Sequence, residues 1–368
     1  MADRRKVSCW ASALAWTGAF QEAEKVLADL ANRAEAIDDR LRIAKALSWM
    51  CFWGRYDVEP AVAYLLQVLG DPDIESGSAR LVADIHQGLA GISLNIADPA
   101  RALEQAQRAA AAQGLELGGS LAASVGGAAL TYLGRCQEAL DVVDEAISAA
   151  TVASNTITAA ELLFVRAAAL SRLGLLEEAV QLLEWLRDVA LTSSLQDATA
   201  IFGVLLGDVL LRQGRAASAS RMLRDTCGLL SERDVLGYRP WALSGLARAR
   251  ALAGEEESAA AALDEARRSQ PIGRHYDMSH YLAEIEVHVL AGRRHEALTA
   301  ARAAVAWARG AGMPFDEAFA LDAWVRLDPD ESVAARLDEL AVSSGALLLR
   351  ALADHARALV DKQPQGLV

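Results

Sequence analysis

The stretch LGLLEEAV at residues 173–180 recurs along the chain and decides the fold. LGRCQEAL at 133–140, AGRRHEAL at 291–298 and TGAFQEAE at 17–24 are close copies, and each has a glycine followed five residues later by an alanine. Weaker copies are QGRAASAS at 213–220 and AGEEESAA at 253–260, and two less regular turns lie at Gly54 and Ala97. The successive turns are 36, 43, 37, 40, 40, 40 and 38 residues apart. A fixed period of this size indicates a solenoid of stacked repeats.

Each part of the repeated stretch has a physical reason. Glycine ends the first helix of a hairpin because it adopts a positive φ without a Cβ clash. Acidic residues such as Glu138 and Glu177 then begin the second helix, where negative charge suits the helix dipole. The alanine is small enough for two helices to cross closely. The pattern predicts an all-α, right-handed α-solenoid of about eight to nine antiparallel, tetratricopeptide-like hairpins.

The repeat also predicts the extent of each hairpin. We expect helix pairs near 4–16/20–34, 38–53/57–69, a third repeat over 79–113, then 118–133/136–151, 156–172/176–191, 196–212/216–231, 238–252/256–268 and 276–290/294–310. After Gly312 the pattern weakens, with helices expected near 315–326, 330–343 and 346–361.

The domain organisation follows from these expectations. Residues 1–311 are predicted to form one solenoid, 312–361 a degenerate C-terminal repeat or cap, and 362–368 a frayed tail. The last helix, LLLRALADHARALV at 347–360, has an apolar face with no following helix to cover it. Solenoids usually end in a polar cap. We therefore expect either that the natural protein continues or that another chain docks there.

Composition and charge restrict the function. The 368 residues carry a net charge of −13, which argues against direct binding to nucleic-acid backbones. No lysine follows a glycine, so the Gly-Lys-Ser/Thr of a Walker A loop is missing. Neither a GxSxG nor a GxGxxG motif is present, and we expect neither an enzyme nor a bound cofactor.

The expected compartment is the cytoplasm. The four cysteines are far apart and form no CxxC, as in reduced intracellular proteins. No apolar run reaches the ~18 residues of a membrane span. The basic start MADRRK and the apolar stretch after it resemble a signal peptide. Gly18 and Ala23, however, are in register with the later repeats, which favours the first helix of repeat one.

A family resemblance lies in the C-terminal third. GRRHEALTAARAAVAWARGAGMPFDEAFALDAWVRL at 292–327, VAARLDELA at 333–341 and ALADHARALV at 351–360 resemble the helical-repeat sensor region of actinobacterial LuxR-type, MalT-like large ATP-binding transcriptional regulators. In that family the region lies between an ATPase and a helix-turn-helix module. The resemblance implies an isolated sensor arm that binds a small-molecule inducer, or a protein or peptide, in its groove. If the chain is a fragment, the ATPase and DNA-binding modules of the parent regulator are further partners.

The candidate site is a run of polar and aromatic residues on two adjacent first helices. These residues are Tyr238, Arg239, Trp241, His275, Tyr276, His280, Tyr281 and Glu284. Such side chains could stack on and hydrogen-bond a small polar ligand or a peptide in the concave groove. The alternative is that the aromatic rings fill gaps between alanine-rich helices.

Metal binding is the weaker interpretation of the histidines. His280, Glu284 and His288 share one helix face, but the two histidines are ~12 Å apart along the axis, too far for one ion. A hydrogen-bonded polar stripe is therefore expected there. His295 and Glu296 begin an HExxH motif, but Thr299 occupies the place of the second histidine.

Two functions remain open from the sequence. The first is a regulatory ligand- or partner-sensing domain of a LuxR/MalT-like regulator. The alternative is a stand-alone tetratricopeptide-like scaffold that binds a protein or peptide partner.

Overall fold

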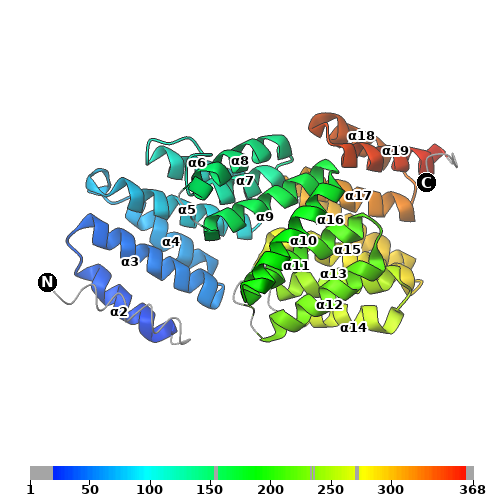
Figure 1. The fold of residues 1–368 in the computed structure, drawn as a ribbon, viewed down its shortest axis with the longest axis horizontal. Helices are drawn as coiled ribbons and strands as arrows, with labels where there is room; N and C mark the ends of the chain where they lie inside the picture. The colour runs from blue at the N-terminus through cyan, green and yellow to red at the C-terminus, as the bar shows by residue number, and fades with distance from the viewer. Residues whose placement is uncertain (1–19, 153–155, 233, 235–236, 270–272, 362–368) are drawn as a thin grey trace. The chain divides into compact units, whose positions relative to one another are not determined.

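The computed structural model describes residues 20–152, 156–232, 234, 237–269 and 273–361, and this part of the chain contains helices and no strands (Figure 1). The expected first helix, Gly18 and the tail at 362–368 lie outside the described residues. The helices are α2 (Phe20–Asn32), α3 (Ile37–Trp49), α4 (Val58–Leu69), α5 (Ala79–Asn95), α6 (Pro99–Ala111), α7 (Ala123–Tyr132), α8 (Cys136–Val152), α9 (Thr156–Leu173), α10 (Leu176–Thr192), α11 (Gln196–Arg212), α12 (Ala216–Glu232), α13 (Arg239–Leu252), α14 (Glu256–Arg268), α15 (Asp277–Leu290), α16 (Arg294–Gly310), α17 (Pro314–Leu327), α18 (Glu331–Ser344) and α19 (Leu347–Asp361). A π-helical turn η1 (Met50–Gly54) and two 3-10 turns, η2 (Ile74–Ser76) and η3 (Arg274–Tyr276), complete the order.

The turns have the backbone that the glycines predict. The glycines at positions 134, 174, 214, 254 and 292 have φ angles of 81°, 92°, 72°, 79° and 70°. The alanines five residues later, at positions 139, 179, 219, 259 and 297, are all 0% exposed. The left-handed turn and the close helix crossing therefore occur together in each hairpin. The predicted all-α solenoid of antiparallel helix hairpins is confirmed.

The two less regular turns use other residues. Gly54 ends the π-helical turn, and the positive φ of 56° falls two residues later, on Tyr56. At the next turn Ala97 itself has a φ of 65°. Both turns place a non-glycine residue in the left-handed region, which costs about 1–2 kcal/mol per residue.

Contacts divide the chain into two compact units, with a division near residue 126. The first comprises the described residues of Met1–Ile96 together with Arg101–Gly126, and the second comprises those of Ala97–Ala100 and Gly127–Val368. In the first unit, α2 and α3 pack through Ala23, Leu27 and Leu47. A further alanine-rich cluster joins α5 to α6 through Ala90 and Ala106.

The second unit curls back on itself. Its C-terminal helices α17 and α19 return to the turns beside α7 and α9. A Cβ atom on Gly174 would lie 3.0 Å from the backbone nitrogen of Leu348, and one on Gly134 would lie 2.7 Å from Cγ of Pro314. Helix α19 also contacts α9 directly. The two ends of this unit therefore touch, and its first helices surround a common interior.

The expectation of an uncovered last helix is wrong. Helix α19 packs against α17 and α18, which lie beside it in Figure 1. Leu349, Ala353 and Ala356 are 0% exposed. Sequence periodicity could not foresee this cover, because it comes from α17 and α18 folding back over the same face and from the return to α9.

Within the residues that the structure describes, no helix combines the length and the apolar character needed to cross a bilayer.

Candidate functional site

An aromatic cluster forms around Trp241 on α13 and Tyr276 in η3. Their rings are stacked, with centroids 4.1 Å apart and planes 10° apart. Tyr238 completes the cluster, with its ring 5.4 Å from that of Tyr276, and the Tyr276 hydroxyl donates a hydrogen bond to the Tyr238 hydroxyl at 3.2 Å. His275 also packs against this cluster, with its ring centroid 3.8 Å from that of Tyr276 and 5.4 Å from that of Tyr132. The structure thus brings together Tyr238, Trp241, His275 and Tyr276 from the predicted site.

The other predicted residues have different surroundings. Arg239 pairs with Glu265, and Glu284 accepts a hydrogen bond from Arg267 at 2.5 Å. Both partners are on α14, the second helix of a hairpin, so these charges tie neighbouring helices together. Tyr281 packs on Trp307 of α16, with ring centroids 5.9 Å apart.

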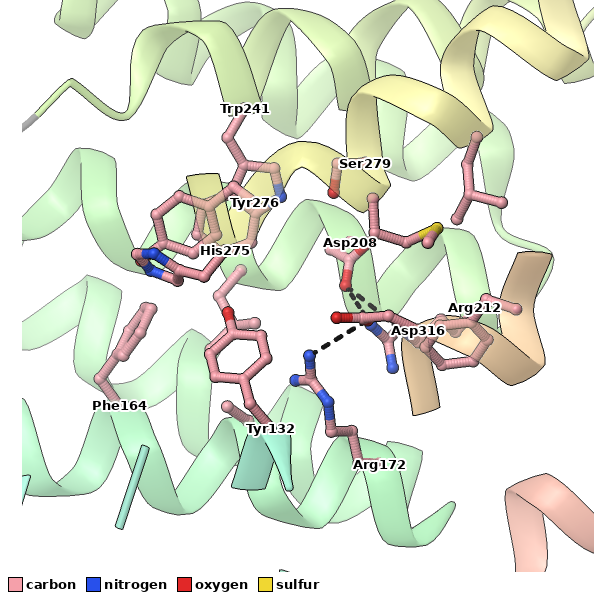
Figure 2. A pocket seen from close by; sticks show the side chains of 15 residues that line it. Tyr132, Phe164, Arg172, Asp208, Arg212, Trp241, His275, Tyr276, Ser279 and Asp316 are labelled. Carbon is pink, nitrogen blue, oxygen red and sulfur yellow. Dashed lines mark hydrogen bonds and ion pairs between the residues drawn. The ribbon is translucent and has the colours of Figure 1, made fainter. Parts of the chain in front are cut away.

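The aromatic cluster forms one wall of an inner cavity of about 50 Å³ (Figure 2). Tyr132 of α7 and side chains from α9, α11, α15 and α17 form the rest, so the cavity lies among the first helices of successive hairpins. Figure 2 shows Arg172, Asp208, Arg212 and Asp316 meeting there, with the Arg172 and Asp316 side chains 3.5 Å apart. Arg212 donates to Asp208 at 2.8 Å.

Aromatic rings hold both guanidinium groups in place. Arg172 lies over the ring of Tyr132 at 4.5 Å, and Arg212 lies over the ring of Phe319 at 4.4 Å. Cation–π contacts of this kind are worth about 2 kcal/mol when the cation is desolvated. Each arginine is therefore fixed by a ring on one side and a carboxylate on the other.

Burial dominates the electrostatics of the inner cavity. It raises the pKa of the Asp316 carboxyl, and the nearby Arg172 only partly offsets this. Burial also lowers the pKa of His275 to about 3, with Arg172 adding to the effect, so the imidazole is neutral at pH 7. Nε of Arg172, Oδ2 of Asp316 and Nδ1 of His275 are buried without a hydrogen-bond partner among the described residues. Polar groups of a ligand or water in the cavity would satisfy them.

Sequence reasoning missed the charged residues of the inner cavity, although the repeat carries a signal for them. Arg172 and Arg212 each lie two residues before a turn glycine, at Gly174 and Gly214. A second register lies six residues before the glycine, where successive first helices carry Asp208, Arg248 and Glu286. Charges at one repeated register mark a single face of the solenoid. A comparison of equivalent positions in successive first helices would have found this face, whereas a search for runs of neighbouring polar residues does not.

Arg248 differs from the other charges of this face. Burial lowers the pKa of its guanidinium, although Glu286 and Asp208 act in the opposite direction. Within the described chain no carboxylate lies in ion-pair range of Arg248, whereas Glu286 pairs with Arg326 at 3.4 Å. Nε of Arg248 is also buried without a partner there. This face thus contains a cation without a direct counter-ion among the residues that the structure describes.

A larger outer pocket lies on the other side of the Trp241–Tyr276 stack. Its volume is about 300 Å³, and α13, α14 and α15 form it with the segments that precede α13 and α15. The lining residues are Gly237, Pro240, Trp241, Ser244, Ala266, Arg267, Ser269, Gly273, Tyr276, Asp277, His280 and Tyr281. Trp241 and Tyr276 line both spaces, so one aromatic wall separates the outer pocket from the inner cavity.

The predicted polar stripe on α15 is present as polar contacts of its two histidines. Nε2 of His288 lies 3.9 Å from Glu284, and Nδ1 of His280 lies 3.3 Å from the Ser244 hydroxyl. No group of three or more metal-ligating side chains is found in the portion of the chain that the structure describes.

Comparison with known proteins identifies the fold without a family. No family model and no curated protein matches the chain. Among solved structures, a Rap protein complexed with Competence and Sporulation Factor is similar, with a TM-score of 0.65 and 12% identity over 98% of this chain and 99% of that one. NprR in complex with its cognate peptide NprX has a TM-score of 0.63 and 12% identity, covering 93% of this chain and 99% of that one.

A third similar structure is the Rap conjugation gene regulator of the plasmid pLS20 in complex with the Phr* peptide. Its TM-score is 0.58 and its identity 13%, and the match covers 99% of this chain and 97% of that one. At such low identity these similarities establish the fold alone, which is that of tetratricopeptide-like helical-repeat proteins.

Proposed function

We propose that the chain is a non-enzymatic regulatory protein whose second unit senses a peptide segment. The peptide would bind on the inner face, defined as the side of α9, α11, α13, α15 and α17 that borders the inner cavity. The observation that carries this proposal is the convergence of charged and aromatic side chains from successive first helices on one cavity. The similar fold of NprR, which has been solved with its cognate peptide NprX, adds support.

Peptide binding on this face requires the second unit to open. The inner cavity of about 50 Å³ has room for one or two water molecules, because each occupies ~30 Å³ in the liquid. A peptide would have to part α17 from α9, and with them the Arg172–Asp316 pair. A partner that binds only the open form shifts the equilibrium toward it, which is how occupancy would become a conformational signal.

The charges of the inner face favour a peptide with at least one acidic group. Asp208 and Glu286 already have arginine partners at 2.8 and 3.4 Å, whereas Arg248 between them has none among the described residues. A peptide carboxylate that paired with Arg248 would supply the missing counter-ion. A charge-assisted hydrogen bond of this kind contributes about 1.5–3 kcal/mol.

The experiment selects peptides from a random display library against the full chain and compares Arg248→Ala with Arg250→Ala. Arg250 is a matched control on the same helix, where it donates to the backbone oxygen of Ser258. We expect the selected peptides to contain acidic residues and to lose roughly 10–100-fold in affinity with Arg248→Ala only. Equal affinities for the two variants would contradict binding at the inner face.

We further propose that the chain is the sensor arm of a LuxR-type, MalT-like regulator, with a cytoplasmic location and a small-molecule inducer as the other possible ligand. The resemblance over 292–360 supports this, and the acidic balance of −13 suits an arm that does not itself grip DNA. The sequence of the parent gene tests it. An ATPase module upstream and a helix-turn-helix downstream are expected. An open reading frame without either would contradict the sensor arm and favour the stand-alone scaffold.

A further inference from the structure

We propose that the outer pocket is a separate binding site for a small neutral aromatic molecule of the phenol or indole class. The proposal does not depend on peptide binding at the inner face, because the described residues that line the outer pocket belong to α13, α14 and α15 or are Gly237, Ser269, Gly273 and Tyr276 beside these helices.

The volume sets the size of the occupant. Ligand pockets range over roughly 300–1,000 Å³, and the outer pocket of about 300 Å³ is at the small end of that range. It therefore suits one or two fused rings better than a larger molecule. The inner cavity, at about 50 Å³, is too small for such a ring in the closed unit.

The walls favour a flat ring. Trp241 and Tyr276 present stacked rings on one side, and Tyr281 contributes a third aromatic side chain, held by its contact with Trp307. Ala266 and Pro240 add apolar surface. Aromatic rings prefer offset-stacked or edge-to-face neighbours at 4.5–7 Å, a geometry that a planar guest can adopt against these side chains.

The charges at the outer pocket are already paired, which favours a neutral guest. Arg267 donates to Glu284 at 2.5 Å and lies 3.4 Å from Asp264. Asp277 pairs with Arg274 at 3.3 Å. An ionised ligand would have to break one of these pairs or be left without a counter-charge.

His280 supplies the polar contact that selects a phenol or indole over a plain hydrocarbon. Burial lowers the pKa of its imidazole, so the ring is neutral at pH 7. Nδ1 is engaged with the Ser244 hydroxyl at 3.3 Å, and Nε2 has no hydrogen-bond partner among the described residues. The Ser244 hydroxyl donates to the Pro240 carbonyl, so Nδ1 carries the imidazole proton and Nε2 is an acceptor, to which a single O–H or N–H on the ligand edge would donate.

Occupancy of the outer pocket would act on the inner face through the shared wall. A ring packed against Trp241 and Tyr276 restricts their motion, and both side chains also line the inner cavity. Coupling between two sites is reciprocal, so a bound aromatic molecule and a bound peptide would change each other's affinity by the same factor.

Isothermal titration and saturation-transfer NMR on the full chain test the site with indole and phenol as probes. Benzoate, cyclohexanol and N-acetyl-tryptophan amide are the comparison compounds. We expect saturable binding of indole and phenol, at least tenfold tighter than that of benzoate or cyclohexanol. His280→Leu should weaken indole about tenfold by removing the hydrogen bond, and Trp241→Leu should abolish detectable binding.

Two controls locate the site. Trp185→Leu removes an exposed tryptophan on α10 that lines neither space, and Arg248→Ala alters the inner face alone. Both should leave indole binding unchanged, whereas Arg248→Ala weakens the peptide. The proposal is overturned by a lack of saturable binding, by equal binding of cyclohexanol, or by an affinity that His280→Leu and Trp241→Leu do not change. Binding of N-acetyl-tryptophan amide but not of indole would also overturn it, because the pocket would then recognise a peptide side chain.

Discussion

The guanidinium of Arg172 on α9 meets the carboxylate of Asp316 on α17 at 3.5 Å, although 144 residues separate them along the chain. Their side chains are only 8% and 5% exposed. A buried pair of this kind adds little net stability, since desolvation offsets most of the attraction, but removal of one partner leaves an uncompensated charge. The pair therefore specifies where the two ends of the second unit meet.

Breaking this pair from one side should be costly. We expect Arg172→Met or Asp316→Leu alone to reduce the free energy of unfolding by about 3–5 kcal/mol, and the double variant to lose clearly less than the sum. Urea denaturation measures all three. Arg166→Met is the matched control on α9, because its pair with Asp144 is partly exposed and should contribute less than about 1 kcal/mol. Strict additivity of the two buried substitutions would show that the contact is not formed.

Substitutions at two turn glycines distinguish the strain of the hairpin turn from the contact that closes the second unit. Gly174→Ala and Gly214→Ala both place a Cβ at positive φ, which costs about 1–2 kcal/mol. Only at Gly174 would the new atom also meet α19, at 3.0 Å from the backbone nitrogen of Leu348, whereas Gly214 has nothing within 4 Å. We expect faster amide hydrogen exchange in α19 for Gly174→Ala alone. The same exchange rates in α19 for both variants would contradict the contact.

His275 should make the protein acid-sensitive. Its folded pKa of about 3 lies below the usual value of 6.5, so the unfolded state takes up a proton that the folded state refuses. Its contribution is therefore intact above pH 6.5 and is lost as the pH falls from there toward 3. At pH 5 the loss amounts to about 2 kcal/mol.

The variant His275→Phe keeps a ring against Tyr132 and removes the titration. The difference in unfolding free energy between His275→Phe and the wild type, followed from pH 7.5 to 5, should grow by that amount. Other groups, including His355, whose pKa a hydrogen bond with Asp322 raises, cancel in this difference. A difference that stays constant with pH would mean that His275 is not buried.

Close packing of α11 on α12 makes one helical glycine indispensable and leaves another replaceable. A Cβ on Gly207 would lie 2.4 Å from Cγ of Leu223, whereas Gly228 has open space around it. We expect Gly207→Ala to destabilise the protein by about 1–3 kcal/mol through overpacking. Gly228→Ala should stabilise it by about 0.5–1 kcal/mol through helix propensity. Thermal unfolding of both variants checks the pair, and a stabilising Gly207→Ala would exclude the close crossing.

The repeat was sufficient to predict the helices and turns, because each depends on residues close in sequence. Gly174 and Ala179 behave as their spacing requires, and the helix boundaries after residue 136 fall within two residues of expectation. The aromatic cluster was also found, since Tyr238, Trp241 and Tyr276 lie at the starts of adjacent first helices. The sequence did not predict that this cluster lies between two spaces, the inner cavity and the outer pocket.

The return of α17 to α9 could not be predicted from the sequence. It depends on small rotations between successive hairpins that add up over several repeats, and no local pattern encodes their sum. Arg172 was overlooked for the same reason, because its partner Asp316 lies at the far end of the unit. The position of Arg172 two residues before Gly174 can be read from the sequence. Its contact with Asp316 depends on the closure of the second unit.

The most direct measurement is the distance between α10 and α19 when a peptide binds. Spin labels on non-natural amino acids at the exposed positions Glu184 and Arg350 of the full chain would report it by pulsed electron paramagnetic resonance. With a library-selected peptide at saturation we predict a shift to longer distances, because the peptide must part α17 from α9. A scrambled peptide should cause none. A selected peptide that binds tightly and leaves the distance distribution unchanged would contradict the account.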